Sequence, residues 1–314
     1  MAERRLILLA AALAAACAIF LTWGARGNWD FVLAFRGAKL AALLVVAASI
    51  AVSTVLFQTI AGNRILTPSI MGFDALFVLF QTVLVFALGG FGVAQLSQEW
   101  RFGMEFVLLL GSAVLLFGTL LGSARYDIHR TVLTGIIFGV LFNSLTVFMQ
   151  RMIDPNDFAV VQMNSFARFN SVETSLLGVS SVLCCAGLVA AWRFRHRLDV
   201  IALGRDHAIS LGIDHRRAVL TILMIVALLV SVSTALAGPV TFFGLLVSAL
   251  AHLSMKTYRH AVLLPAAALI AGIVLVAGQT VTERILALST PLSVAVEFLG
   301  GLVFLILILK GTQR

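Results

Sequence analysis

Ser248 and His252 are the residues whose types and spacing come nearest to a catalytic arrangement. A helix would place them on one face, as a serine nucleophile and its base would lie in an intramembrane hydrolase. No oxyanion-hole motif accompanies them, and the sequence lacks the phosphate-binding pattern GxxxxGK[ST]. We therefore interpret the pair as a packing or hydrogen-bonding element, and we expect no catalytic site and no ATP site in this chain.

The cysteines show no spacing typical of metal ligands. Cys17, Cys184 and Cys185 all lie inside apolar stretches, where free cysteine behaves as a small hydrophobic residue. Neither a CxxC motif nor a Cys/His pattern occurs in the sequence. We expect no metal site, no cofactor and no disulfide framework.

Several carboxylates lie within or beside apolar stretches, where ionised groups are costly and often functional. Glu297 lies inside the last stretch and is the best candidate for a proton-carrying group. Asp74 and Glu105 lie nearer to stretch ends, so we expect them to reach solvent. Glu283 and Arg284 are adjacent and are expected to form a local ion pair. A carboxylate at mid-membrane would favour a proton-coupled secondary transporter, which stays open as an alternative.

The composition indicates that the solvent of this chain is a lipid bilayer. Of its 314 residues, 61% are hydrophobic and only 11% are charged, and the mean hydropathy is +1.07. A soluble domain has about a quarter of its residues charged. The net charge of +8 is therefore interpreted as a signal of membrane orientation rather than of a nucleic-acid partner.

The apolar stretches predict an all-α polytopic membrane protein with about ten spans in a single domain, 1–314. A span needs roughly 20 apolar residues. Arg4 and Arg5 precede a first stretch that we interpret as a span rather than as a cleaved signal peptide. The expected spans are 6–23, 38–60, 73–94, 103–123, 131–151, 174–192, 218–237, 241–255, 261–281 and 292–310.

The distribution of positive charge predicts that both termini are cytoplasmic. With the N-terminus inside, most Lys and Arg residues fall in the cytoplasmic loops, as the positive-inside rule requires. This orientation places the polar stretch 195–217 in the cytoplasm. The eighth span is short, and Gly238 and Pro239 are expected to break the backbone before it.

The stretch 195–217 contains a pattern that predicts a short amphipathic helix outside the membrane. Leu203, His207 and Leu211 recur at helical spacing, with Ala208 beside them. Gly204 precedes this helix, and Gly212 is a suitable C-terminal stop. A short exposed helix of this kind can insert into a groove of a partner protein.

These residues resemble the permease subunits of bacterial ATP-driven importers for iron–siderophores, haem and vitamin B12, the FecCD-type family. The loop 203–212 is similar to the family's coupling helix, and the resemblance covers nearly the whole chain. Four further motifs carry it: Gln58 with Asn63-Arg64-Ile65-Leu66-Thr67-Pro68-Ser69-Ile70-Met71-Gly72, Arg36-Gly37-Ala38-Lys39, Leu133-Thr134-Gly135, and Ala237-Gly238-Pro239-Val240-Thr241-Phe242-Phe243-Gly244-Leu245-Leu246-Val247.

The resemblance implies a multi-pass protein of the bacterial inner membrane with the type II importer fold. Two permease subunits would form the pathway, a pair of ATP-binding subunits would bind ATP and magnesium, and an extracytoplasmic protein would deliver the cargo. The residues to which it assigns roles are Leu203, Gly204, Arg205, Asp206, His207, Ala208, Leu211 and Gly212 for ATPase coupling; Arg36, Lys39 and Arg284 for binding-protein docking; Asn63, Ile65, Pro68 and Gly72 for the pathway and inner gate; and Gly238, Pro239 and Gly244 for the structural break.

The sequence also departs from the family pattern. Arg64 stands where the family has proline, Ser248-Ala249 replaces its Pro-His, and Gln279 replaces its aspartate. The late motif is Thr290-Pro291-Leu292-Ser293. These departures resemble the permeases of catecholate-type siderophore importers and favour a heterodimer with a sister permease. The particular chelate stays open.

Overall fold

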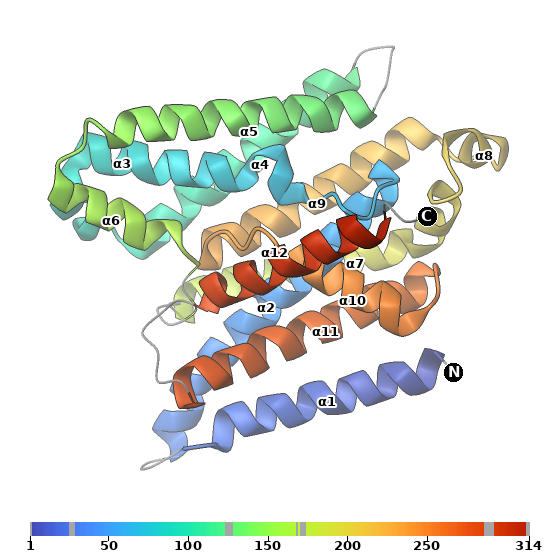
Figure 1. The fold of residues 1–314 in the computed structure, drawn as a ribbon, viewed down its shortest axis with the longest axis horizontal. Coiled ribbons are helices and arrows are strands. Elements are labelled where there is room, and N and C mark those ends of the chain that lie inside the picture. The colour runs from blue at the N-terminus through green and yellow to red at the C-terminus, as the bar shows by residue number, and fades with distance from the viewer. Residues whose placement is uncertain are drawn as a thin grey trace.

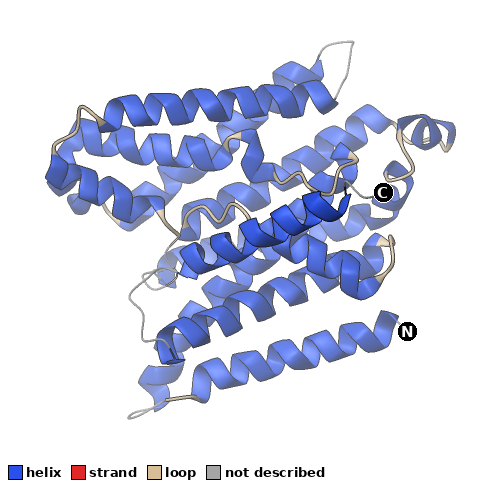
Figure 2. Cartoon of the chain, viewed as in Figure 1, coloured by secondary structure: helices blue, strands red, loops and turns tan. Residues whose placement is uncertain are grey.

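The computed structural model describes residues 2–24, 29–122, 128–167, 169, 174–285 and 292–311, and these residues are helical apart from short connections (Figures 1 and 2). The membrane-length elements are α1 (Ala2–Thr22), α2 (Trp29–Ala61), α3 (Phe73–Gln95), α4 (Gln98–Gly122), α5 (Ile128–Gln150), α7 (Thr174–Ile201), α9 (His215–Ala237), α11 (His260–Thr280) and α12 (Leu292–Gly311). The shorter ones are η1 (Pro68–Met71), α6 (Pro155–Ser165), α8 (Arg205–Ser210), α10 (Phe243–Met255) and η2 (Val281–Ile285).

The predicted all-helical membrane architecture is confirmed. Within the described residues, eight helices are long and apolar enough to cross a bilayer. The expected span 241–255 corresponds to the shorter helix α10, and the expected span 292–310 corresponds to α12, Leu292–Gly311, in which the apolar part is counted over Leu292–Leu302. α2 begins earlier than predicted, at Trp29 rather than at residue 38.

The bundle is organised around α2 and α9. In both helices 72% of the most apolar window is buried, against 6% in α1 and 17% in α5. α2 packs on α11, α9 and α7, while α1 lies along one edge against α11 (Figure 1). A helix that is hydrophobic all round is suited to this central position, whereas α5 leaves one side for lipid or another subunit.

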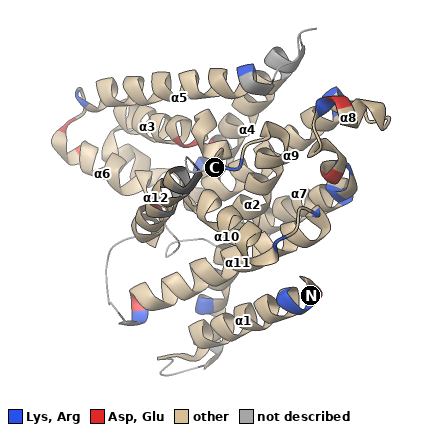
Figure 3. Cartoon of the chain, turned by 45° about the vertical axis from the view of Figure 1, so that its right-hand side comes forward, with Lys and Arg blue, Asp and Glu red and all other residues tan. Residues whose placement is uncertain are grey.

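Both termini of the described chain lie at the same end of the bundle as α8, and we name this the α8 end (Figure 1). The opposite end, with α6 and the start of α4, is the α6 end. Figure 3 shows Lys, Arg, Asp and Glu gathered towards the two ends, while most of the drawn helix length between them is uncharged. This arrangement agrees with the predicted orientation, in which the α8 end is cytoplasmic.

The polar stretch 195–217 lies partly within the flanking helices, because α7 continues to Ile201 and α9 begins at His215. Ala191, Leu198 and Ile201 are buried at helical spacing, so one face of α7 keeps packing beyond the apolar stretch. Arg195 and Arg197 project from the other side, against the rings of Trp192 and Phe194. The connection outside α7 and α9 is therefore only 202–214.

Two connections between helices, the first and second breaks, turn back into the bundle, and α3 is in addition kinked at Gly89, where φ is +70°. After α2 the chain turns back towards the middle of the bundle through η1 before α3 begins, and after α9 it turns back before α10 (Figure 1). Backbone groups at membrane depth need partners within the protein. Gly72 ends η1 with φ +92° and donates its N–H to Ser69 O at 3.1 Å, and Gly238 ends α9 with φ +97° and donates to Thr234 O at 2.8 Å.

The first break packs against a groove of small residues on α5. The two glycines of that groove, Gly135 and Gly139, are one helical turn apart and face Met71 and Gly72. A Cβ on Gly135 would lie 2.9 Å from Met71 Cβ and 3.1 Å from Met71 Cα. Small residues allow such close approach in membranes, where packing drives helix association. The Gly at the start of the predicted fifth span is therefore explained by backbone contact.

We predict that Gly135→Ala destabilises the protein, although alanine is the better helix former by about 1 kcal/mol. The added methyl group would push η1 away from α5, and overpacking of this kind costs about 1–3 kcal/mol. Thermal unfolding of the purified protein in detergent measures the effect. Gly178→Ala on α7 is the matched control, because nothing lies within 4 Å of its added Cβ. An unfolding temperature that rises equally in both variants would contradict the packing argument.

Candidate coupling, gate and docking sites

α8 and its flanking turns, residues 203–212, form a compact projection at the end of the bundle, which we call the α8 knob. Gly204 before it and Gly212 after it have φ of +103° and +81°, a region that favours glycine. Ala208 is fully buried, and its carbonyl accepts a hydrogen bond from Ile213 N at 3.0 Å. Ala208 therefore anchors the helix to the body of the protein.

The outward surface of this knob is apolar. Leu203, Ile209 and Leu211 are 60%, 50% and 63% exposed, and Arg205, Asp206 and His207 are exposed beside them. At the polar end of a membrane protein, an exposed aliphatic cluster rimmed by charge is typical of a protein-binding surface. The structure thus adds Ile209 to the predicted residues and turns Ala208 inward. The coupling role of these residues stays a prediction.

The predicted inner-gate residues lie in the first break, close to the same end. Asn63 Oδ1 accepts a hydrogen bond from Ile65 N at 2.9 Å, which closes a tight turn. Pro68 is buried at the start of η1, and Gly72 ends it. Arg64, the departure from the family pattern, is held over the ring of Tyr258 at 5.1 Å.

Gln58 ties this turn to α10. Its Nε2 donates to Arg64 O at 2.6 Å and to Ser248 Oγ at 2.9 Å. The Ser248 hydroxyl in turn donates to Leu245 O at 3.0 Å, while His252 Nδ1 contacts the Ser248 carbonyl at 2.8 Å. Ser248 and His252 are therefore not joined through the hydroxyl, and the hydrolase alternative lacks its nucleophile–base hydrogen bond.

A second polar cluster joins three helices near α8. His260 is 2% exposed, and its Nδ1 lies 2.7 Å from Asp199 Oδ1. The other ring nitrogen, Nε2, lies 2.7 Å from Thr59 Oγ1. Asp199 also accepts from His260 N at 2.8 Å, so it caps the start of α11. Asp199 precedes the α8 knob and Thr59 precedes the gate turn, and His260 bridges the two.

Arg36 was expected to dock an extracytoplasmic protein, and in the structure its guanidinium caps the last turn of α1. It donates to Leu21 O at 2.8 Å, Trp23 O at 3.0 Å and Gly24 O at 3.2 Å. The last carbonyls of a helix have no intrahelical partner, and a cationic side chain satisfies them well. Arg36 thus holds α1 to α2.

The expected ion pair between Glu283 and Arg284 was wrong, because Glu283 pairs with Lys39 and also accepts from Gln279 Nε2. Lys39 is only 11% exposed in this pair. The Arg284 side chain is exposed and lies beside Gly24. Adjacent residues on a helix point in different directions, so Glu283 reaches across to α2 instead. Docking by Lys39 and Arg284 stays a prediction.

The second break is packed on three sides. Gly238 is so close to the segment after α6 that an added Cβ would lie 2.9 Å from Ala167 Cα. Pro239 follows Gly238, and the helix cannot continue through it. Gly244 lies in the first turn of α10 and packs against α2, where an added Cβ would meet the Thr54 side chain. Gly300 of α12 faces Phe242 in the same way.

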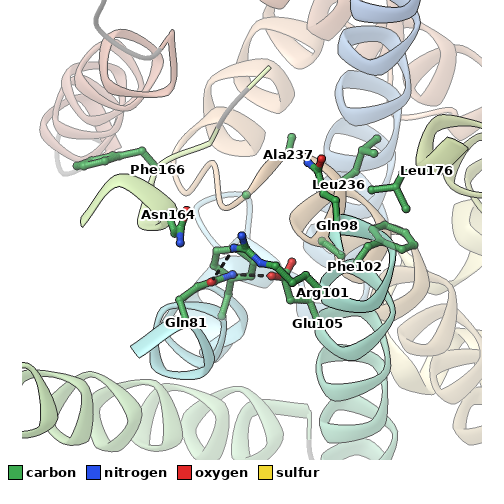
Figure 4. Close-up of a pocket in the computed structure, with 13 residues that line it drawn as sticks. Gln81, Gln98, Arg101, Phe102, Glu105, Asn164, Phe166, Leu176, Leu236 and Ala237 are labelled. Atoms are coloured by element: carbon green, nitrogen blue, oxygen red, sulfur yellow. Dashed lines mark hydrogen bonds between the residues drawn. The ribbon is translucent and has the colours of Figure 1, made fainter. Parts of the chain in front are cut away.

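The prediction that Glu105 and Asp74 reach solvent was wrong. Glu105 is 5% exposed and accepts a hydrogen bond from Gln81 Nε2 at 2.6 Å (Figure 4). Asp74 Oδ2 is buried and has no hydrogen-bond partner among the described residues, and Glu297 is half-buried on α12. The hydrogen-bond partner of Glu105 comes from the neighbouring helix α3. The position of Glu105 along its own helix could not indicate that partner.

The sequence analysis missed Gln81, Asp199, His260 and Thr59. Gln81 and Thr59 are single polar residues in apolar stretches, whereas Asp199 and His260 lie in polar segments at the helix ends, and in each case the partner lies far along the chain. The only signal available was polarity at membrane depth, which marks a functional or structural contact without naming the partner.

A protein-family model described as the FecCD transport family matches residues 6–310. The petrobactin import system permease protein YclO of Bacillus subtilis is 42% identical over 307 residues, covering 98% of both chains. The permease FatC of the petrobactin import system of Bacillus anthracis is 31% identical over 277 residues, covering 88% of this chain and 78% of that one. A metal-chelate type ABC transporter in an inward-facing conformation has the same fold, with a TM-score of 0.85 at 20% identity over 99% of this chain and 100% of that one.

We predict that Arg36→Gln lowers stability. The variant loses charge-assisted hydrogen bonds to the end of α1, which are worth about 1.5–3 kcal/mol when one partner is ionised. Thermal unfolding in detergent measures this loss. Arg284→Gln, which removes an exposed charge near the same turn, is the control and should leave the unfolding temperature unchanged. Unchanged stability together with weaker binding of the extracytoplasmic protein would instead favour the docking role of Arg36.

Proposed function

The chain belongs to the FecCD transport family, and from this premise we propose that its cargo is a ferric chelate of the petrobactin type. It is a multi-pass permease subunit of an ATP-driven iron–siderophore importer of the cytoplasmic membrane, and ATP is bound and hydrolysed by a partner subunit. It carries no ATP site or cofactor of its own. A substrate-binding protein is the second kind of partner.

The observation that carries the choice of cargo is the 42% identity with a petrobactin permease over 98% of both chains. A second petrobactin permease is 31% identical, whereas haem, hydroxamate and vitamin B12 permeases are 23–27% identical. Petrobactin is a catecholate siderophore, so its ferric complex is bulky and its aryl oxygens are ligands of the iron.

In our proposal the α8 knob is the contact with the ATPase. The exposed Leu203, Ile209 and Leu211 would enter a groove of the ATPase. The buried Ala208 would then transmit a displacement of α8 to α7 and α9. The Asp199–His260–Thr59 cluster supports a connection from this knob to the gate turn at Asn63 and Ile65. Opening would then be a rigid-body movement of packed helices rather than bending of single side chains.

The proposed assembly has two permease subunits around a central pathway and two ATPase subunits below it. A sister permease in place of a second copy would make it a heterodimer. At the α6 end, we propose that the binding protein contacts exposed Arg284, while the Arg36 cap and the Lys39–Glu283 pair hold α1, α2 and η2 in register beneath it. An exposed charge mainly contributes to steering and register.

Family membership argues against the alternative of a proton-coupled secondary transporter. That alternative required a carboxylate at mid-membrane, for which Glu297, half-buried near the start of α12, was the best candidate. Family membership supplies an ATPase as the source of energy.

The proposed cargo is tested by uptake of iron-55-labelled ferric petrobactin in host cells with the gene deleted and then restored. We expect deletion to abolish uptake, and the restored gene to rescue it only when the ATPase partner is intact. Iron supplied as ferric citrate serves as the control for general iron uptake. Uptake that continues without this chain, or without any ATPase, would contradict the proposal.

The coupling surface gives a second prediction. Leu203→Asp with Leu211→Asp places two charges on the exposed side of the knob, so the ATPase should no longer co-purify and uptake should fall at least about tenfold, since burying an unpaired charge in an interface costs several kcal/mol. Both side chains are exposed, so the unfolding temperature should stay unchanged.

Arg217→Ala is the matched control, because it changes an 87% exposed side chain at the same end. Normal ATPase co-purification with the doubly substituted knob would show that α8 is not the coupling contact.

A further inference from the structure

One side of α7 is left uncovered by the rest of the described chain. The other side packs on α2, α9 and α11, and residues there, such as Gly187 and Ala191, are buried. The uncovered residues recur at spacings of three and four, so they form one continuous stripe along the helix. The exposed members that we call the α7 stripe are Val179, Val182, Cys185, Ala186, Val189 and Trp192.

The α7 stripe has the length of a membrane core. Val182 and Val189 are 69% and 59% exposed, and they lie in a helix that is long and apolar enough to cross a bilayer. From Thr174 to Trp192 an α-helix rises about 27 Å, close to the roughly 30 Å of the hydrocarbon core. Trp192 then lies at the boundary of that core, where tryptophan is enriched.

Directly after Trp192 the same side of α7 becomes basic. Arg193 and Arg197 are both exposed and lie one turn apart on one face. The helix carries Arg197 only about 7.5 Å beyond Trp192, whereas the head-group region extends roughly 5–7 Å beyond the core. Figure 3 shows Lys and Arg at this end of α7, beside α8. The arginines therefore lie at head-group depth.

In the described part of the chain these arginines have no acidic partner. No carboxylate lies within 4.0 Å of Arg193, Arg195 or Arg197. Arg195 and Arg197 instead lie over the rings of Trp192 and Phe194, with 4.5 and 5.1 Å from Cζ to the ring centroid. Stacking on a ring leaves the N–H donors in the guanidinium plane available. The positive charge on this side is thus left for a group outside the chain.

The depth of these groups decides which partner they fit. A soluble subunit such as the ATPase can reach the α8 knob, but it cannot cover a stripe at the depth of the hydrocarbon core. A phospholipid covers both levels, since its acyl chain packs on aliphatic residues while its phosphate accepts hydrogen bonds from guanidinium groups. Anionic lipids give the cytoplasmic leaflet a negative surface potential that attracts basic residues beside a membrane span.

We propose that this end of α7 binds one anionic phospholipid of the cytoplasmic leaflet, with Arg193 and Arg197 as the phosphate contacts and Val189 and Trp192 against its acyl chain. The choice of leaflet rests on the proposed orientation, in which the α8 end is cytoplasmic. α7 ends at Ile201, directly before the α8 knob. The bound lipid would therefore hold the base of the knob at a fixed depth.

The test measures quenching of Trp192 fluorescence by phospholipids with brominated acyl chains, in the assembled importer reconstituted in vesicles. An importer with Trp192→Phe is measured in parallel, and the difference isolates the emission of this ring. Brominated phosphatidylglycerol should bind at least about tenfold more tightly than brominated phosphatidylcholine, since each basic residue at the surface contributes roughly fivefold. A salt concentration of about 1 M should weaken this preference.

Variants of the two arginines identify the contacts. Arg193→Gln together with Arg197→Gln should bring the two lipids within about twofold of each other. The unfolding temperature and the quenching by phosphatidylcholine should stay unchanged, because both side chains are exposed. Arg217→Gln is the matched control, since it removes an 87% exposed charge at the same end, on α9, and it should leave the preference unchanged.

Equal quenching by both lipids in the unchanged importer would overturn the site. Absence of quenching by either lipid would also overturn it, because a protein partner would then cover the α7 stripe. An equal loss of preference in the Arg217→Gln control would do the same, since general surface charge would explain the effect. The vesicles contain no cargo, so this experiment and the uptake of ferric petrobactin fail independently.

Discussion

The structure depends on one constraint, which is that backbone polar groups inside a bilayer must find their partners within the protein. Unbroken helices meet it by themselves. Besides a kink in α3 at Gly89, the chain interrupts its helices after α2 and after α9, and each of these two interruptions then needs a close neighbour. Glycine supplies it in both places: Gly135 and Gly139 of α5 receive the first break, and Gly238 packs on the segment after α6. The close packing of the bundle follows from these contacts.

Polar side chains are used sparingly and mostly join segments that are distant in the sequence. Gln58 joins the gate turn to α10, and His260 joins α7 to α2. In an apolar medium such bonds have few competitors, and an unpaired group is expensive. They are therefore suited to keeping helices in register while the assembly moves as rigid bodies. The His260 cluster joins the end of α7, which precedes α8, to the end of α2, which precedes the gate turn, and in our proposal it connects the two.

The two ends of the protein use charge differently. Near α8, Arg195 and Arg197 stack on aromatic rings at the surface and keep their charge available to lipid head groups or a partner. At the α6 end, Arg36 and Lys39 are engaged inside the chain, and Arg101 donates a hydrogen bond to Gln81. The cationic side chains at that end thus join neighbouring helices.

The sequence by itself determined the membrane class, the approximate bounds of most helices and the family, because long apolar stretches and local motifs are properties of contiguous residues. It could not determine the partners of Arg36, Glu283 and Glu105, or that Ala208 faces inward. Those depend on which helices become neighbours and how each is rotated about its axis. In a chain that is apolar on nearly every side of each helix, hydrophobic periodicity gives little information on rotation. Only tertiary packing decided it.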